Sequence, residues 1–576
     1  MSDAATLCEA FQRTAATRGR APALRTVQGD VLTWAQYAER VASVAAGLHG
    51  LGVRHGDTVA LMLTNRPEFH VADCAAFHLG AIPFSLYNTL PPDQLTDVLT
   101  RARARVLVTE RRFLALLRPA LAGTDVEHLV TVDGSGPGDD AIGLAAVEAA
   151  APTGFDFAAT WQRVRPGDLL TLIHTSGTTG RSKAVEITHA GMTAQLDATD
   201  ELLGITHEDS HLSFLPAAHI ADRWASHYTN IRFGTRLTCV PDLKDLPDAL
   251  TSVRPTLFGA VPAVWQRLKA GLDAALTEAD PGLRALVEGC IDTACRLAAG
   301  RRAGTLTAEQ AKELDEAEPV LAELRKRIGL DRARVCVTGA APASAGLVEF
   351  FHAIGVPLGD AWGMSELSGM ALMNPPGDPR PGTVGRPVPG ARIRVAEDGE
   401  LLVSAPFVMR GYRDEPGLTA GAIDSDGWLH TGDVVTVDDD GNVRIIDRKK
   451  DIIINTGGKN MSPTRIESVL LEASPLIGHV VVIGDGRPYN VALITPDREA
   501  VTARAAQTGA VDAEREIAAA VEYANTRLSR PERIRAHAVL RDAWEPGGPE
   551  LTVTLKVRRG AVEQRYAQLI ESFYAR

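Results

Sequence analysis

Hydrophobic and polar positions follow two different rhythms in the first 165 residues. Residues 59–63 and 105–109 are short apolar runs bounded by polar segments, the pattern of buried strands. Residues 33–41 begin with Thr33 and place apolar side chains at helical spacing, which predicts a capped amphipathic helix. Strands that alternate with helices in this way predict a largely parallel sheet covered by helices.

The pattern changes twice further along the chain. Residues 264–330 are rich in Ala, Leu, Glu and Arg and hold almost no β-branched clusters, so they are predicted to form consecutive helices inserted into the alternating pattern. A strand pattern resumes at 334–339. From about 383 to 447, short β-runs such as 391–395 and 399–404 are separated by Gly, Pro and Asp, which predicts an antiparallel, meander-like subdomain.

The charge cluster Asp-Arg-Lys-Lys-Asp at 447–451 separates two β-runs and is the sharpest candidate for a domain boundary. It is followed by a compact pattern of a helix at 466–471, strands at 479–483 and 491–495, and helices up to 528. We therefore predict an α/β protein with two domains. Residues 1–447 form a large domain of helix-covered mixed or parallel sheets with a β-rich part, and residues 448–576 form a small, mobile α+β domain.

Composition narrows the class of protein without identifying it. The 576 residues are 45% hydrophobic and 23% charged, which is ordinary for a globular protein. The net charge of −12 argues against nucleic acid as the principal partner. No secretory signal and no apolar run of roughly 20 residues is seen, so a cytoplasmic protein is expected. The six cysteines form no CxxC pair, which predicts buried reduced thiols rather than a metal site.

The segment 174–183, His-Thr-Ser-Gly-Thr-Thr-Gly-Arg-Ser-Lys, carries the clearest chemistry. Five hydroxyl side chains, two glycines and a lysine follow the apolar run 169–173. Glycines let the backbone approach an anion, hydroxyls donate to phosphoryl oxygens, and Lys183 adds a positive charge. The segment is neither a Walker A loop nor G-x-G-x-x-G. An ordinary surface turn is the alternative interpretation.

Two further segments have side chains suited to a nucleotide. Gly339, Ala340 and Ala341 follow a predicted strand and would allow a flat ring to approach closely. In the segment 360–366, Trp362 could stack on adenine and Glu366 is a hard oxygen ligand for Mg²⁺. The alternative is a Trp in the core and a solvated Glu.

Three weaker candidates lie in the last third of the chain. Asp433 ends the strand-like run 430–433 and could accept both hydroxyls of a ribose, with Arg448 beside it, although a plain Gly-Asp turn is the commoner fate of such a sequence. The Gly-rich segment 455–463 enters a predicted helix, whose N-terminal turn it could simply be. Lys556 alternates with apolar residues as on a half-buried strand, although an exposed edge position is equally ordinary.

In order and wording, these segments resemble the core motifs of the adenylate-forming acyl-CoA synthetase superfamily, which also contains luciferases and peptide-synthetase adenylation domains. The matching segments are 175–180, 362–366, 430–433, 447–451, 457–460 and 555–556. Segments 212–219, 258–265 and 456–463 are similar to the long-chain fatty acyl-CoA synthetases in particular. The chain departs from the family at Ser182 and Ala184, where Pro and Gly are usual, and at Ser365 and Val553.

The resemblance implies that a fatty acid is activated by ATP to an acyl-adenylate and then passed to coenzyme A. It implies catalytic roles for Lys556, His219, Lys183, Thr175 and Glu366, with Thr175 and Glu366 holding Mg²⁺. It also implies the following binding residues for ATP and coenzyme A: Thr175, Ser176, Gly177, Thr178, Thr179, Gly180, Lys183, Gly339, Ala340, Ala341, Asp360, Ala361, Trp362, Gly363, Met364, Ser365, Asp433, Arg448, Lys450, Gly457, Gly458 and Lys459. By the same resemblance, the small domain rotates about a hinge near Lys450, within 447–451, and brings residues 457–459 to the site in place of Lys556.

Alternatives stay open at this point. One is a fatty acyl-AMP ligase that passes its adenylate to a carrier protein, and another is a nucleotide-binding homologue without turnover. The acyl chain length cannot be read from the sequence, because it depends on a pocket built from several segments: small residues such as Ala217 hint at room, whereas Trp224 and Trp265 could close it. Peripheral membrane contact and a monomeric or homodimeric state are both compatible with the sequence.

Overall fold

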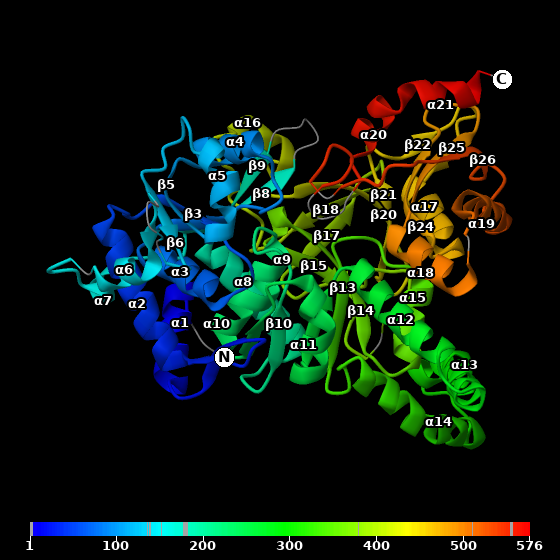
Figure 1. Cartoon of the computed structure of the whole chain (residues 1–576), viewed down its shortest axis with the longest axis horizontal. Helices are drawn as coiled ribbons and strands as arrows, with labels where there is room; N and C mark the ends of the chain where they lie inside the picture. The colour runs from blue at the N-terminus through cyan, green and yellow to red at the C-terminus, as the bar shows by residue number, and fades with distance from the viewer. Residues whose placement is uncertain are drawn as a thin grey trace. The chain divides into compact units, whose positions relative to one another are not determined.

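The computed structural model describes residues 4–134, 136, 140–150, 152–176, 182–377, 379–509, 511–545, 547–552 and 557–575 (Figure 1). The chain divides into two compact units. The first consists of Met1–Ile393, Val403–Leu429 and Asp438–Val443, and the second of Arg394–Leu402, His430–Val437 and Arg444–Arg576. The predicted boundary between residues 447 and 448, with its hinge, stays a prediction.

The largest sheet of the first unit has eight strands. In spatial order they are β19 (Gly411–Tyr412), β9 (Ser182–Thr188), β8 (Leu169–Ser176), β4 (Ile82–Ser85), β3 (Thr58–Met62), β5 (Ala104–Thr109), β6 (His128–Thr131) and β7 (Ile142–Gly143). The pairs from β8 to β7 are parallel, whereas β9 and β19 pair antiparallel at one edge. The predicted strands at 59–63 and 105–109 are β3 and β5, so the parallel sheet is confirmed.

Helices cover this sheet because its central strands are apolar on both faces and must be shielded from water. The helices of this part are α1 (Leu7–Arg18), α2 (Trp34–Gly50), α3 (Pro67–His78), α4 (Pro92–Ala102), α5 (Leu114–Ala120), α6 (Leu144–Ala149), α7 (Phe157–Trp161) and α8 (His189–Leu203). The predicted helix at 33–41 is α2, and Thr33 and Gln36 form a complete capping box at its start. Apolar side chains of α4 and α5 pack against β3, β4 and β5.

A second sheet of the first unit has the order β12 (Leu257–Ala260), β13 (Val335–Gly339), β14 (Leu358–Met364), β15 (Gly369–Met373) and β16 (Arg386–Pro387). The first three strands are parallel and the last two join antiparallel. The predicted helical insertion is confirmed as α12 (Pro262–Thr277), α13 (Pro281–Ala303) and α14 (Ala308–Arg327), followed after β13 by α15 (Ala345–Ala353).

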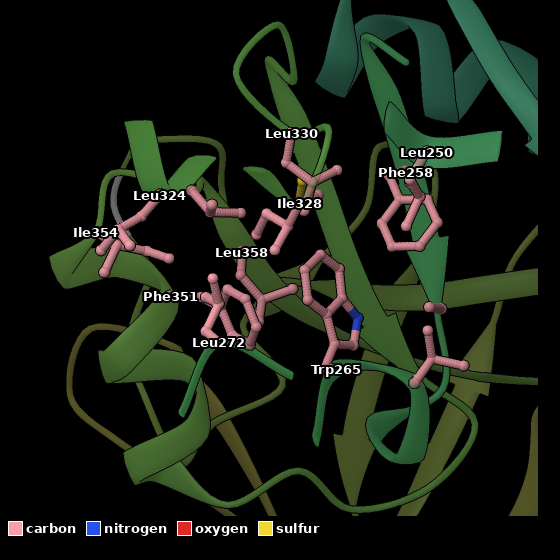
Figure 2. Packing of buried hydrophobic residues seen from close by; sticks show 14 of the residues in the cluster. Leu250, Phe258, Trp265, Leu272, Leu324, Ile328, Leu330, Phe351, Ile354 and Leu358 are labelled. Atoms are coloured by element: carbon pink, nitrogen blue, oxygen red, sulfur yellow. The ribbon is translucent and has the colours of Figure 1, made fainter. Parts of the chain in front are cut away.

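Trp265 of α12 lies in the core beside this sheet (Figure 2). Its ring meets Phe258 and Phe351 edge-on, at centroid distances of 5.2 and 4.9 Å, and its indole N–H donates to the carbonyl of Val337. The ring is fully buried among apolar side chains of the insertion and the sheet, such as Leu324. Trp265 is therefore a core residue, and its predicted alternative role of closing the acyl pocket stays a prediction.

A third sheet pairs segments from distant parts of the first unit, in the order β10 (Ser210–Ser213), β11 (Arg236–Cys239), β1 (Pro22–Thr26) and β2 (Val31–Thr33). The chain between β10 and β11 forms the short helices α9 (Ile220–Asp222), η2 (Arg223–Tyr228), which is a π-helix, and α10 (Thr229–Phe233). Helix α11 (Leu246–Val253) follows β11.

The region 383–447 is less regular than predicted. Strands β17 (Arg392–Val395), β18 (Glu400–Ser404), β20 (Leu429–Val437) and β21 (Val443–Arg448) form one sheet in chain order. However, β16 and β19 join two other sheets, and α16 (Pro416–Ala422) interrupts the strands. The meander was therefore wrong in part, because short strands with few apolar residues do not encode which sheet they will join.

The remaining chain of the second unit has the α+β pattern predicted for it. Its elements are β22 (Ile453–Ile454), β23 (Asn460–Met461), α17 (Pro463–Ala473), β24 (Ile477–Ile483), β25 (Asn490–Pro496), α18 (Arg498–Thr508), α19 (Ala513–Arg527), β26 (Ile534–Val539), α20 (Arg559–Arg565) and α21 (Ala567–Tyr574). Strands β24, β25 and β26 form a sheet with an apolar core against α17 and α19.

Two sequence-based expectations, on membrane-spanning segments and on the burial of the cysteines, can be compared with the structure. Within the part of the chain that the structure describes, no helix is both long enough and apolar enough to cross a membrane. Four of the cysteines are buried as predicted, whereas Cys290 is half-buried and Cys295 is exposed on α13. The prediction of buried thiols is therefore wrong for Cys295.

Candidate active site

Strands β8 and β9 form an antiparallel hairpin that carries the predicted phosphate loop. Thr175 lies opposite Lys183 in the register, and the Thr175 hydroxyl donates to the Lys183 carbonyl over 3.4 Å. The hairpin therefore brings the hydroxyl and the ammonium-bearing residue to the same end of the sheet. Gly177, Thr178, Thr179 and Gly180, together with the Ser176 side chain, lie outside the described residues.

The two departures from the family pattern in this loop occupy ordinary strand positions. The Ser182 hydroxyl donates to the Thr175 carbonyl over 3.3 Å, which ties the two strands together at the base of the loop. Ala184 pairs with His174 on β8, and its carbonyl accepts from the Arg413 N–H beside β19 over 2.9 Å. Neither residue interrupts β9, so Lys183 keeps its place in the strand.

Glu366 and Lys183 are linked through a residue that the sequence did not indicate. The Tyr412 hydroxyl donates to Glu366 Oε1 over 2.8 Å, and Lys183 Nζ lies 5.0 Å from the centroid of the Tyr412 ring. Glu366 is buried in the 3₁₀ turn η4 (Ser365–Leu367), directly after β14. The structure thus brings Thr175, Lys183 and Glu366 together, although they come from segments nearly 200 positions apart.

Tyr412 was missed because nothing near it in the sequence is unusual for a loop. A Gly-Tyr pair after an apolar run is compatible with any turn. The signal that could have found it is the strand pairing of β19 with β9, where Tyr412 faces Val185 across the ladder. That pairing is a long-range contact, which local pattern does not encode.

The two predicted adenine segments lie on neighbouring strands. In the parallel pairing of β13 with β14, Gly339 is the partner of Ala361, and Ala340 follows with a φ of +64°. A Cβ on Gly339 would come within 2.8 Å of the Ala361 carbonyl oxygen, so only glycine permits this approach. Residues 339–341 therefore lie beside residues 360–364, where β13 ends against β14. That Trp362 stacks on adenine stays a prediction.

Asp360 has the most unusual electrostatic environment of the predicted site residues. Its side chain is buried on β14, and this burial raises the pKa of Asp360 to about 7. A carboxyl group that titrates near neutrality can bind a ligand as donor or as acceptor. Perturbed pKa values of this kind are commoner at functional sites than elsewhere.

His219 lies at the start of α9, in the turn that follows β10. Its Nδ1 accepts from the N–H of Ala221 over 3.1 Å, which means that a neutral ring carries its proton on Nε2. The turn is fixed from below by Arg223, a fully buried side chain that donates to the Ala217 carbonyl and pairs with Asp73 of α3. The His219 ring therefore sits on a rigid turn.

Trp224 follows in the π-helix η2 and packs against β15. A Cβ on Gly369 would lie 3.0 Å from the Trp224 ring, so the indole lies directly on the strand that follows Glu366. The indole N–H donates to the Thr199 hydroxyl over 3.1 Å. The segment of His219 and the segment of Glu366 are thereby in contact, as a single acyl site would require. The predicted role of Trp224 in closing that site stays a prediction.

In the second unit, Asp433 and Arg448 form an ion pair, with Arg448 Nε 2.7 Å from Asp433 Oδ1. Asp433 is buried and Arg448 is half-exposed. The segment 430–433 was predicted to end a strand, but it lies at the beginning of β20 instead. The next residue, Lys449, pairs with Asp398 and Glu400, and this cluster secures the turn after β21.

The predicted Gly-rich loop closes a hairpin between β22 and β23. Asn455 Oδ1 accepts from the N–H groups of Gly457 and Lys459, both over 3.0 Å, and Gly458 has a φ of +72°. The helix predicted to start near Pro463 is confirmed as α17, which begins at Pro463, and residues 455–459 form the hairpin turn that precedes it. Lys450 is exposed in the turn before β22. Lys556 lies outside the described residues.

Comparison with known families covers most of the chain. Residues 11–413 match the family model described as AMP-binding enzyme, and residues 450–576 match that of the AMP-binding enzyme C-terminal domain. A Mycobacterium tuberculosis protein named as the fatty-acid–CoA ligase fadD11 is 46% identical over 434 residues, which cover 73% of this chain and 76% of that protein. The long-chain-fatty-acid–CoA ligase FadD15 of Mycobacterium bovis is 32% identical over 94% of this chain and 92% of its own length.

Solved structures share the fold. The adenylation domain of a carboxylate reductase from Mycobacterium chelonae has a TM-score of 0.79 at 20% identity, covering 100% of this chain and 92% of that one. The anthranilate CoA ligase AuaEII with anthranoyl-AMP has a TM-score of 0.75 at 22% identity, covering 98% of each chain. These likenesses show the fold of adenylate-forming enzymes, with a large N-terminal and a small C-terminal domain. With the family models matched in sequence and the motif residues gathered in space, the chain belongs to the AMP-binding enzyme family, whose members form acyl-adenylates.

Proposed function

We propose that this AMP-binding enzyme is a long-chain fatty acid–CoA ligase. A fatty carboxylate attacks the α-phosphorus of ATP and displaces pyrophosphate, and the thiol of coenzyme A then attacks the acyl-adenylate carbonyl and releases AMP. The observation that carries the proposal is the arrangement of Thr175, Lys183 and Glu366 around Tyr412 in a chain whose relatives are named fatty-acid–CoA ligases. The long-chain preference rests on those names and on the segments 212–219 and 258–265.

The first half-reaction joins two anions, so its main requirement is positive charge at the site. A unit charge about 4 Å from an opposite charge contributes about 4 kcal/mol at an effective dielectric near 20. Lys183 would hold the outer phosphates, and Lys556 would neutralise the carboxylate and the α-phosphate during attack. His219 would border the acyl group and shield its carboxylate from water.

The donor set of the first unit fits Mg²⁺. This ion prefers hard oxygen ligands and is usually held by one or two carboxylates together with substrate phosphates. The Glu366 carboxylate and the Thr175 hydroxyl are oxygen ligands of this kind. Thr175 pairs with Lys183 in the strand register, and Tyr412 contacts both Lys183 and Glu366. When bound, Mg²⁺ supplies charge neutralisation to the pyrophosphate leaving group. Glu366 and Thr175 would hold it, and Lys183 would orient the phosphates.

The remaining parts of the nucleotide would contact the other predicted residues. Gly339 to Ala341 and Asp360 to Trp362 would frame adenine, and the Asp433–Arg448 pair would fix the ribose. For the second half-reaction, the residues 457–459 would replace Lys556 at the site after the small domain turns near Lys450. Three properties of the whole protein stay predictions. They are its location in the cytoplasm, a peripheral contact with a membrane, and a monomeric or homodimeric state.

The test separates the two half-reactions. Lys556→Ala should lower ATP–pyrophosphate exchange by roughly 10²- to 10³-fold, the usual cost of losing one preorganised charged group. It should spare thioester formation from supplied acyl-AMP. Equal loss of both half-reactions would contradict the assignment of Lys556 to the first step.

The wild-type enzyme decides between the alternatives. Thioester formed with coenzyme A alone supports the ligase, whereas release of acyl-AMP without thioester supports a carrier-protein ligase. A panel of acids from acetate to very long chains, followed by pyrophosphate release, measures the chain-length preference. Absence of exchange with every acid would leave only a nucleotide-binding homologue without turnover.

A further inference from the structure

Tyr412 occupies a position between two charged residues of opposite sign. Its hydroxyl donates to Glu366 Oε1 over 2.8 Å, and its ring faces Lys183 Nζ at 5.0 Å. Among the residues that the structure describes, Lys183 and Glu366 form no ion pair with each other. Each charge is therefore held by a different part of one neutral side chain.

The backbone of Tyr412 is fixed from both sides. On β9, Glu186 and Ala184 accept from the N–H groups of Arg410 and Arg413, at 3.0 and 2.9 Å, so the ladder continues before and after β19. The Tyr412 N–H itself donates to the Thr419 hydroxyl over 2.9 Å. Gly411 permits this approach, because a Cβ there would come within 2.9 Å of the Thr419 side chain.

Glu366 needs a hydrogen-bond donor where it lies. Its side chain is buried, and a buried carboxylate without a partner is strongly disfavoured. Lys183, a cation that could pair with it, contacts the same tyrosine through the ring. A direct ion pair would cancel both charges, and it would have to be broken before phosphates and a cation could bind.

We propose that Tyr412 is a positioning residue that holds the Glu366 carboxylate and the Lys183 ammonium in place while keeping them from neutralising each other. Its hydroxyl satisfies the buried carboxylate and leaves the other oxygen for a divalent cation. Its ring attracts the ammonium through a cation–π contact and leaves the N–H donors for phosphate. The proposal rests on the proposed function in one respect, namely that these two residues meet Mg²⁺ and ATP.

Two substitutions separate the two contacts. Tyr412→Phe removes the hydroxyl and keeps the ring, so binding of Mn²⁺, a paramagnetic stand-in for Mg²⁺, to the ATP-saturated enzyme should weaken roughly 10-fold or more, the value of a hydrogen bond to a charged group. ATP binding in EDTA should stay within about twofold of wild type, since Lys183 keeps its ring. Tyr412→Leu removes both contacts and should weaken both binding events.

Equilibrium titrations without fatty acid provide these values, using Mn²⁺ electron paramagnetic resonance and nucleotide fluorescence. Tyr37→Phe is the matched control, because Tyr37 also lies in the first unit and also donates a hydroxyl hydrogen bond, but to the His70 carbonyl instead. It should change neither binding event. Unchanged Mn²⁺ binding by Tyr412→Phe would overturn the proposal, as would equal losses of Mn²⁺ and of ATP in EDTA.

The variants also test a positioning role during turnover. Tyr412→Phe should raise the Mg²⁺ concentration needed for half-maximal pyrophosphate exchange and leave the KM for the fatty acid unchanged. A structural defect would instead change both values and lower the melting temperature. Thioester formation by the wild-type enzyme is measured on the same preparation, and its absence would refute the proposed function without affecting the binding result.

Discussion

Two aspartates of the first unit lie in surroundings that disfavour their charge. Burial raises the pKa of Asp222 and of Asp360 to about 7, well above the usual range of an aspartate. Asp360 belongs to the predicted nucleotide edge of β14. Asp222 instead lies beneath the His219 turn, where it accepts from the Ser213 hydroxyl. The same physical cause thus acts at a predicted binding position and at a supporting one.

Asp222→Asn should change how stability depends on pH. The folded pKa lies above the unfolded one, so ionisation of Asp222 costs folding free energy that grows as pH rises from about 4 to about 7. Asparagine carries no such cost. The melting temperature of the variant relative to wild type should therefore be higher at pH 8 than at pH 5, as thermal unfolding at both values would measure.

The exposed residue Asp245 is the control, and Asp245→Asn should give the same small shift at both pH values. If the change in melting temperature caused by Asp222→Asn is also equal at pH 5 and pH 8, the Asp222 carboxyl does not titrate in the range given. Because Asp360 is present in every protein compared, its own titration cancels in the difference.

Among the elements, strand β14 is the one whose packing most constrains the site. It pairs with β13 on one side and with β15 on the other, and it leads directly into the turn of Glu366. Gly363 was predicted as a cofactor-binding residue from the family motif. A Cβ there would lie only 2.0 Å from the Gly369 carbonyl oxygen, which gives the glycine a packing reason of its own.

Gly363→Ala should therefore separate β14 from β15 and displace Glu366. We expect a loss of stability of about 1–3 kcal/mol from overpacking, measured by urea unfolding, together with weaker ATP binding. Gly259→Ala on β12 is the matched control, since a Cβ there meets nothing within 4 Å. Wild-type stability and ATP affinity in Gly363→Ala would contradict the close approach of the two strands.

The local sequence pattern predicts those elements whose signals lie within the element itself. Helix α2 is marked by its capping box, β3 by its continuous apolar run, and the insertion of α12 to α14 by its composition. The short strands β16 and β19 have no comparable signal, because two residues cannot show a period. Their partners are chosen by distant segments, and the predicted meander failed there for that reason.

At the scale of the whole molecule, the predicted site residues divide between the two compact units. Lys183, Glu366 and Asp360 belong to the first unit, and Asp433 and Lys459 to the second. An enzyme that changes which lysine faces its substrate between two steps would need such a division. Whether the small domain turns about Lys450 is tested by separating the half-reactions.

Lys459→Ala should have the opposite effect to Lys556→Ala. The turn of Lys459 is organised by backbone contacts to Asn455, so removing the side chain should leave the fold intact. ATP–pyrophosphate exchange should stay near wild type, whereas thioester formation from acyl-AMP and coenzyme A should fall about 10- to 100-fold, the value of one contact to a charged group. Rapid quench of the two steps measures both.

Lys244→Ala, on an exposed lysine of the first unit, is the control and should leave both steps unchanged. If Lys459→Ala and Lys556→Ala impair the same half-reaction, the two lysines do not alternate. If each impairs a different one, domain rotation is the simplest physical account of how two distant lysines serve one site.

The sequence by itself determined the family, the classes of element and the chemical character of most candidate residues. The glycines, hydroxyls and charges of a phosphate loop such as 174–183 lie close together in the sequence, because the ligand groups that they surround are only a few ångströms across. The tertiary structure decided which of these segments meet. The Thr175–Lys183 register, the Gly339–Ala361 approach and the placement of Tyr412 between Lys183 and Glu366 all depend on strand pairing. Each strand pairs with a segment that is distant in the sequence, and the free energy of this pairing is gained only when the whole sheet forms. A local pattern therefore does not predict which strands pair.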